Sequence, residues 1–146
     1  MSNEQYAFLR KDKVPSLAQW QQAIDSAGFD LKIDPGLKIF EHSGFLPCKL
    51  LGHDSGVETY YYSANEVIEN CPDIEDEIGD RDYCVSFRWG GNFSEAACAM
   101  ILSYALMSNC DAVVSYEGEE PSDPEAFRSE TEEMINEAKK AFRRNK

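Results

Sequence analysis

The feature that most constrains the fold is an apolar segment, residues 96–107, that stands between two strand-like stretches. It reads AACAMILSYALM and is apolar nearly all round, which is typical of a helix buried at the centre of a domain. Residues 83–89 before it alternate between apolar and polar side chains, as a strand with one apolar face does. Residues 112–116 after it predict another strand. A strand, a helix and a strand in so short a space predict a right-handed crossover between two parallel strands.

Two further helices are predicted, one on each side of this centre in the sequence. Residues 16–19 have the form of a capping box, and the apolar stripe that follows ends at Gly28, a natural helix stop. The last helix is expected to begin with Asp123 as its cap and Pro124 at its first position, and to dock its apolar face on the sheet. Its basic end, residues 139–146, is the arrangement that the helix dipole favours.

A short stretch, Asp54-Ser55-Gly56, contains the residue types found in the nucleophile loop of serine hydrolases. Residues 45–51 and 57–62 are strand-like runs on either side of residues 52–56. A hairpin with a loop of about five residues therefore accounts for the glycine, aspartate and serine residues of this stretch. A trypsin-like loop would need glycine where Val57 stands, and a G-x-S-x-G elbow would need glycine at His53. The stretch is therefore interpreted as a hairpin turn.

The fold class follows from these segments. At 146 residues and 42% hydrophobic composition the chain is expected to be one globular domain spanning residues 1–146. Alternation at residues 29–33 adds a strand to those above. The prediction is a single-domain α+β fold: a mixed sheet of about five strands, an N-terminal helix, a buried central helix and a C-terminal amphipathic helix. Residues 1–13 are polar and are expected to be flexible.

Cysteines and glycines give no evidence of a metal, cofactor or disulfide. The five cysteines are odd in number, widely spaced and free of any C-x-x-C pair, so buried reduced thiols are expected. Phosphate-loop motifs are absent around Gly90-Gly91. The alternating acids from Asp73 lack the glycine of a calcium loop, because Ile78 stands in its place. The sequence thus predicts no catalytic residue, no metal ligand and no cofactor.

Charge is the strongest functional signal. The chain has 27 Asp and Glu against 14 Lys and Arg, a net charge of −13, and between residues 51 and 137 the 21 acids face only three arginines. Such a surface repels nucleic acid phosphates and speeds encounter with a basic partner, although it also serves solubility alone. No run of residues is apolar enough for a membrane span or a signal peptide, so a cytoplasmic location without membrane contact is expected.

The residues expected to bind a protein partner are acids in two clusters and two tyrosines on the polar face of a strand. They are Asp73, Glu75, Asp76, Glu77, Asp80, Asp82, Glu117, Glu119, Glu120, Tyr60 and Tyr62. Carboxylates steer and orient a basic partner, and aromatic anchors supply much of the affinity. Arg88 is expected to pair with a nearby carboxylate.

The segment from Val85 through Phe87-Arg88-Trp89-Gly90-Gly91 to Leu106, with Gly44-Phe45-Leu46-Pro47 upstream, resembles small acidic bacterial immunity proteins that neutralise the toxins of competing cells. The resemblance covers about half of the chain and lies in size, acidity and layout, so no functional residue is carried over from it. It implies a cytosolic inhibitor of one cognate toxin, often a basic nuclease.

Two other functions stay open at this point. A nucleic acid mimic would share the charge but would place its carboxylates in long rows, whereas here they cluster in loops. An enzyme or a small-molecule-binding domain would need a site, and His42, His53, Asp54 and Glu58 are the residues that could converge on one.

Overall fold

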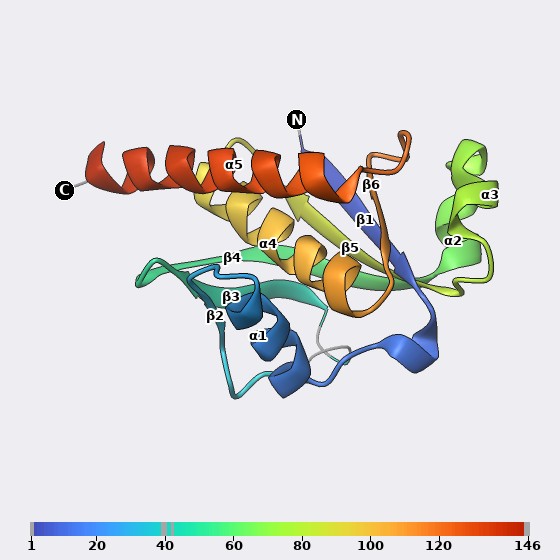
Figure 1. Ribbon diagram of the computed structural model, residues 1–146, viewed down its shortest axis with the longest axis horizontal. Coiled ribbons are helices and arrows are strands. Elements are labelled where there is room, and N and C mark those ends of the chain that lie inside the picture. The colour runs from blue at the N-terminus through green and yellow to red at the C-terminus, as the bar shows by residue number, and fades with distance from the viewer. Residues whose placement is uncertain (1, 39–40, 42, 145–146) are drawn as a thin grey trace.

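One antiparallel sheet organises the molecule. The computed structural model describes residues 2–38, 41 and 43–144, and these form six strands in the spatial order β2-β3-β4-β5-β1-β6 (Figure 1). The strands are β1 (Asn3–Leu9), β2 (Leu31–Ile33), β3 (Gly44–Leu50), β4 (His53–Ser63), β5 (Tyr83–Trp89) and β6 (Val113–Tyr116). The α-helices are α1 (Leu17–Ser26), α2 (Ala64–Ile68), α3 (Glu75–Ile78), α4 (Phe93–Asn109) and α5 (Pro124–Arg144), with short 3₁₀ helices η1 (Lys11–Lys13) and η2 (Pro72–Ile74). The α+β class is confirmed.

The sheet differs from the prediction in strand number and pairing. It has six strands rather than about five, and its neighbouring strands are all antiparallel. The two strands that flank α4 do run in the same direction, because β5 and β6 are each antiparallel to β1. They are not neighbours, since β1 lies between them.

The N-terminal residues supply this intervening strand, so the expectation that residues 1–13 are flexible was wrong. Ala7 and Leu9 are fully buried on the helix-covered side of β1, and Phe8 is fully buried on the other side. A strand buried on both sides loses the alternation that identifies strands in a sequence, and a run of apolar residues takes its place. This is why β1 was missed.

Helices α1, α4 and α5 all lie on one side of the sheet (Figure 1). α4 is at the centre of the main core, as its apolar sequence predicts, and the Trp20 indole N–H donates to the carbonyl of Leu102 at 3.2 Å to fix α1 against it. α5 begins at Pro124 as predicted, but it packs mainly on α4 rather than directly on the sheet. No helix within residues 2–38, 41 and 43–144 combines the length and the hydrophobicity needed to span a membrane.

The opposite side of the sheet is covered only in part. α2, η2 and α3 close over Phe8 of β1 and Cys84 of β5 with a second, smaller apolar cluster that includes Ala64, Val67 and Ile78. These short helices occupy a segment whose acids were expected to lie in loops. They cover one end of the sheet, which leaves β3 and most of β4 without helices on that side.

The stretch Asp54-Ser55-Gly56 belongs to the hairpin of β3 and β4. Its turn is two residues long, Leu51 (φ 54°) and Gly52 (φ 81°), rather than five, so the three residues lie within β4. Ser55 donates to the hydroxyl of Ser94 at 2.9 Å and accepts from the Cys98 thiol at 3.6 Å. The serine is therefore part of the contact between β4 and α4, and the hairpin interpretation is confirmed.

All five cysteines are free thiols, as expected. Four are buried and Cys71 is half-buried. Burial raises the pKa of the Cys84 and Cys110 thiols, which keeps them protonated and unreactive.

Candidate partner-binding surface

The uncovered side of the sheet presents aromatic and charged side chains from three adjacent strands. We call this surface the open face and define it by Phe45 of β3, Glu58, Tyr60 and Tyr62 of β4, and Arg88 of β5. Side chains alternate along β4, so Glu58, Tyr60 and Tyr62 lie on the open face. Val57, Thr59 and Tyr61 lie on the face that contacts the helices. Phe45 is 48% exposed and Tyr62 is 38% exposed. The face predicted for Tyr60 and Tyr62 is confirmed.

Charges on the open face are paired but stay near water. Arg88 lies directly across from Glu58 on β4 and from Glu4 on β1, and its Nε is 3.6 Å from Glu4 Oε1. The carboxylate partner expected for Arg88 is thus Glu4. The Tyr60 hydroxyl donates to Glu58 at 3.1 Å, and this hydrogen bond raises the pKa of Tyr60. The result is a mixed surface in which carboxylates stand beside aromatic rings.

Phe45 is a member of the open face that the sequence did not identify. Its ring lies over Gly56 of the neighbouring strand, where a Cβ atom would come within 2.6 Å of the ring and would also clash with the Leu46 carbonyl. Gly56 has φ 148°, which other residues rarely adopt. The glycine of the apparent nucleophile motif is therefore needed for the packing of Phe45.

The first acidic cluster stands at one end of the sheet, on η2 and α3. Asp73, Glu75, Asp76 and Glu77 are exposed, and none of them forms an ion pair with another described residue. The segment is held down by Ile74 and Ile78, which are buried in the second apolar cluster. Four carboxylates are thus displayed on a short fixed segment.

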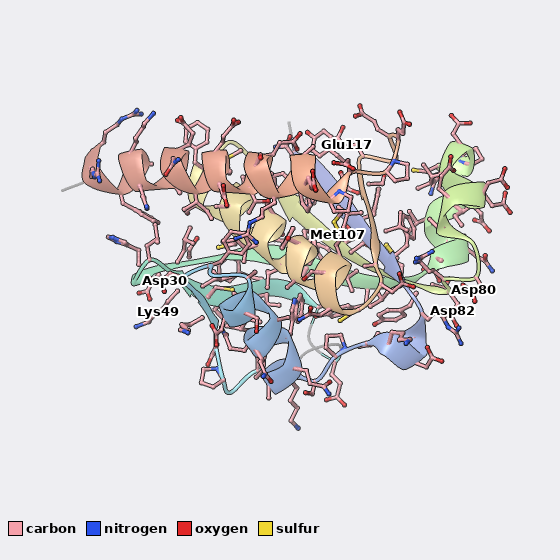
Figure 2. All side chains as sticks on the ribbon, in the orientation of Figure 1. Asp30, Lys49, Asp80, Asp82, Met107 and Glu117 are labelled. Atoms are coloured by element: carbon pink, nitrogen blue, oxygen red, sulfur yellow. The ribbon has the colours of Figure 1, made fainter. Side chains whose placement is uncertain are left out.

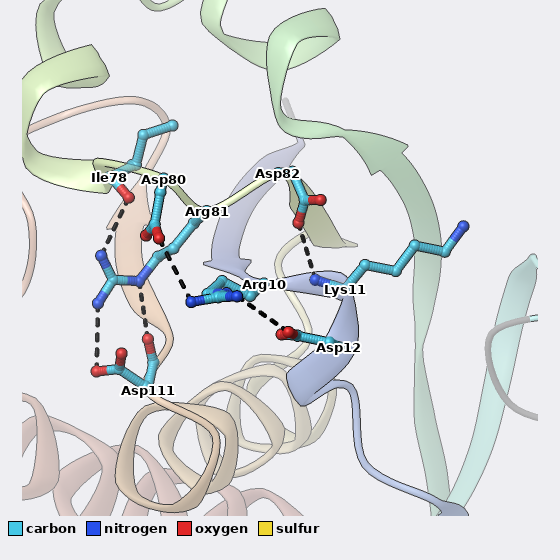
Figure 3. Close-up of polar contacts among 8 residues, drawn as sticks. All are labelled: Arg10, Lys11, Asp12, Ile78, Asp80, Arg81, Asp82 and Asp111. Atoms are coloured by element: carbon cyan, nitrogen blue, oxygen red, sulfur yellow. Dashed lines mark hydrogen bonds and ion pairs between the residues drawn. The ribbon is translucent and has the colours of Figure 1, made fainter.

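Asp80 and Asp82 have internal partners and contribute less to this display. Figure 3 shows the contacts: Arg10 reaches Asp80 at 3.5 Å and Asp12 at 3.0 Å, and the Lys11 backbone N–H donates to Asp82 at 2.8 Å. These bonds join the end of β1 to the start of β5. The two residues therefore help to fix the acidic segment, and their predicted role in binding is untested.

Arg81 anchors the same segment from the other side. Its Nε donates to the Asp111 carbonyl at 2.8 Å, its Nη1 donates to the Ile78 carbonyl at 3.0 Å, and its Nη2 is 3.2 Å from the Asp111 carboxylate (Figure 3). The Arg81 side chain is 18% exposed, whereas most ion pairs here are at the surface. It connects α3 to the short loop between α4 and β6.

We expect Arg81→Ala to lower the free energy of unfolding by about 1–2 kcal/mol, because two charge-assisted hydrogen bonds to carbonyls are lost. Amide hydrogen exchange of residues 72–82 should also accelerate. Arg88→Ala is the control: its side chain is about half exposed and makes a longer ion pair, so a loss of no more than about 0.5 kcal/mol is expected. Equal losses in urea denaturation of the two variants would show that Arg81 is not an anchor.

The second acidic cluster, Glu117, Glu119 and Glu120, lies in the loop between β6 and α5, and it packs beside the first. Gly118 stands so close to Cys71, the residue before η2, that a Cβ atom on it would be 2.5 Å from the cysteine sulfur. Figure 2 labels Glu117 at the start of this loop, where its backbone N–H donates to the Glu4 carbonyl at 2.9 Å. We call the seven exposed carboxylates of the two clusters the acidic edge: Asp73, Glu75, Asp76, Glu77, Glu117, Glu119 and Glu120.

Gly118→Ala should disturb this contact, because alanine is strained at φ 83° and its methyl group would meet Cys71. We expect a loss of about 1–2 kcal/mol in the free energy of unfolding, measured in urea, and faster exchange in residues 68–74. Gly90→Ala is the matched control, since nothing lies within 4 Å of a Cβ atom there and its φ is not positive. A Gly118→Ala variant as stable as Gly90→Ala would contradict the close packing of the two clusters.

The histidine and carboxylate set of the enzyme hypothesis does not come together on β4. His53 stacks on Phe142 of α5 with ring centroids 4.0 Å apart, so it faces the helices. Asp54 and Glu58 point to the other side of the sheet and are four residues apart, about 13 Å along a strand. His42 lies outside the described residues. Among those that are described, no group of three or more His, Cys, Asp or Glu side chains could hold a metal ion.

Comparisons of the chain with models of protein families, with curated proteins and with solved structures found no match.

Proposed function

We propose that this protein is an acidic binding protein that inhibits a basic protein partner, and that it acts in the cytoplasm as an immunity protein against a cognate toxin. The partner would dock on the open face and the acidic edge together. Tyr60, Tyr62 and Phe45 would be its apolar anchors. The carboxylates of the acidic edge would guide a positively charged surface into register.

The observation that carries the proposal is the proximity of the two acidic clusters. They are about 40 residues apart in the sequence, yet Gly118 in the loop of the second cluster packs against Cys71, two residues before the first cluster begins. Fixed carboxylates raise the rate of encounter with a basic partner, and exposed aromatic side chains then slow its dissociation. Both elements are present here, on elements that are themselves anchored by buried residues.

The exposed aromatics favour this function over a nucleic acid mimic. A mimic depends on charge, and its complex should weaken steeply as salt is added. Phe45 and Tyr62 offer apolar area that a phosphate-binding surface has no reason to contact. An enzyme remains the alternative of another class, and Ala substitution of His42 and His53 tests it: an unchanged biological effect would argue against a histidine-based site.

The proposal is tested by affinity capture from the native cells and from the medium of competing cells, at low and at high salt. The test variant removes three charges of the acidic edge: Glu75→Gln, Asp76→Asn and Glu77→Gln. The control variant, Asp30→Asn, Glu125→Gln and Glu133→Gln, removes three charges from exposed sites elsewhere.

We expect the wild type to retain one basic protein in stoichiometric amount at both salt concentrations. The test variant should associate with it about tenfold more slowly at low salt, and the control variant should differ from wild type by less than about threefold. Purified protein should also suppress the toxic activity of the captured partner. Equal association rates for the two variants would contradict a role for the acidic edge, and capture that disappears on adding salt would favour the mimic.

A further inference from the structure

A cavity of about 390 Å³ opens on the helix-covered side of the sheet, away from the open face. It lies between the ends of β5 and β6, the start of α4 and the middle of α5, and aromatic rings form much of its wall. Trp89 and Tyr116 have ring centroids 6.3 Å apart and an interplanar angle of 48°. Phe93, 42% exposed, stands at the entrance. The cavity is therefore open to solvent and lined by aromatic faces.

A hydrogen-bond acceptor at the inner wall has no partner in the described part of the chain. Gln5 lines the cavity and is only 3% exposed. The Ser103 hydroxyl gives its single hydrogen to the Ala99 carbonyl at 2.7 Å, so it can only accept from Gln5, whose Nε2 is 2.7 Å away. This fixes the amide orientation and leaves Gln5 Oε1 without a donor. Gln5 Oε1 is not fully enclosed by protein, so water or a ligand in the cavity can donate a hydrogen bond to it.

The charge around the cavity is negative. Among the described residues that line it, Glu130 of α5 is the one acidic or basic residue, and it is exposed and without an ion pair. Burial and the nearby carboxylates of Glu117 and Glu119 raise the pKa of Tyr116. Of the charged side chains in the described part of the chain, the cavity wall thus includes one carboxylate and no lysine or arginine.

The start of α4 does not turn the cavity into an anion site. The Asn92 side chain accepts hydrogen bonds from the backbone N–H groups of Ser94 and Glu95 at 2.8 and 3.1 Å. It also accepts from the Ser94 hydroxyl at 2.7 Å. These three donors are therefore occupied within the protein and do not point an unpaired hydrogen into the cavity.

We propose that this cavity binds a guanidinium or ammonium group carried on a short alkyl stem. The cation would lie against the faces of Trp89 and Tyr116, donate to Gln5 Oε1, and pair with the Glu130 carboxylate. The stem would contact the apolar wall near Phe93. The group belongs either to a free small molecule or to an arginine or lysine side chain of a peptide. The site is separate from the open face, and its existence does not depend on the inhibitor function.

The test is a titration of ¹⁵N-labelled protein with butylguanidinium and with its neutral isostere butylurea, followed by NMR. The side-chain amide of Gln5 and the indole N–H of Trp89 are the reporters, and the indole of Trp20, which is fully buried elsewhere, is the internal control. We expect saturable shifts at Gln5 and Trp89 with at least about tenfold tighter binding of the cation than of the urea. Glu130→Gln should weaken binding of the cation about threefold to fivefold, and Glu133→Gln, three residues further along α5, should leave it unchanged.

A second arm identifies the source of the cation. A short peptide that contains arginine binding at least about tenfold more tightly than butylguanidinium would assign the site to a protein side chain, and equal affinities would assign it to a small molecule. Equal binding of butylguanidinium and butylurea would overturn the proposal. So would the absence of a saturable shift at Gln5 and Trp89, or identical effects of Glu130→Gln and Glu133→Gln.

Discussion

Trp20→Ala should lower the free energy of unfolding by about 3–5 kcal/mol, a large share of the stability of a domain of this size. Trp20 is fully buried, its ring lies 6.5 Å from that of Phe87 on β5, and its indole N–H bonds to α4. The substitution leaves a cavity at the point where α1, α4 and the sheet meet. Urea denaturation followed by circular dichroism measures the loss.

Trp20→Phe is the matched variant for this prediction. It keeps an aromatic ring and loses the smaller part of the volume and the hydrogen bond to Leu102, so a cost of about 1–2 kcal/mol is expected. A Trp20→Ala variant that loses less than about 1 kcal/mol would contradict the position of this residue in the core. At temperatures where the variant stays folded, its affinity for the partner should equal that of wild type, because the open face is on the other side of the sheet.

Replacing Tyr60 and Tyr62 together by alanine should weaken partner binding by about 2–4 kcal/mol, or roughly 30-fold to 1,000-fold. The two rings stand on the open face, and buried aromatic anchors dominate the energetics of most interfaces. The loss should come mainly from faster dissociation, since the carboxylates that guide encounter are unchanged. Surface plasmon resonance with the captured partner separates the two rates.

The paired variant Tyr60→Phe and Tyr62→Phe keeps both rings and removes only the hydroxyl groups. It should bind within about threefold of wild type, apart from any loss through the hydrogen bond to Glu58. The alanine variant should also unfold at nearly the wild-type urea concentration, because Tyr62 is exposed and Tyr60 is half-buried. Unchanged dissociation in the alanine variant would contradict the use of the open face.

The sequence predicted well those parts of the fold that depend on local signals. Three of these signals depend only on residues close together in the sequence. They are the capping box at Ser16, the all-round apolar character of α4 and the alternation around Tyr60. Asp123 and Pro124 likewise mark the start of α5 from their own backbone preferences. In each case the sequence pattern lies within the helix or strand that it predicts.

What the sequence could not predict depends on contacts between distant segments. β1 inserts between β5 and β6, and its burial on both sides removed the alternation that would have revealed it. The proximity of the acidic clusters depends on Gly118 meeting Cys71, and the exposure of Phe45 depends on which strand ends the α2 to α3 segment covers. The sequence therefore identified the two tyrosines and the acids of the candidate surface, but not Phe45 or the way in which these residues come together.

The most direct test of the account is the hydrogen-exchange footprint of the partner on this protein. The complex and the free protein are compared, peptide by peptide, with the partner recovered by capture. We expect slower exchange in residues 56–63, 72–80 and 117–120, which hold the open face and the acidic edge, and little change in α1 and α5. Protection confined to α1 and α5, with none in β4 or the acidic clusters, would contradict the proposed binding surface.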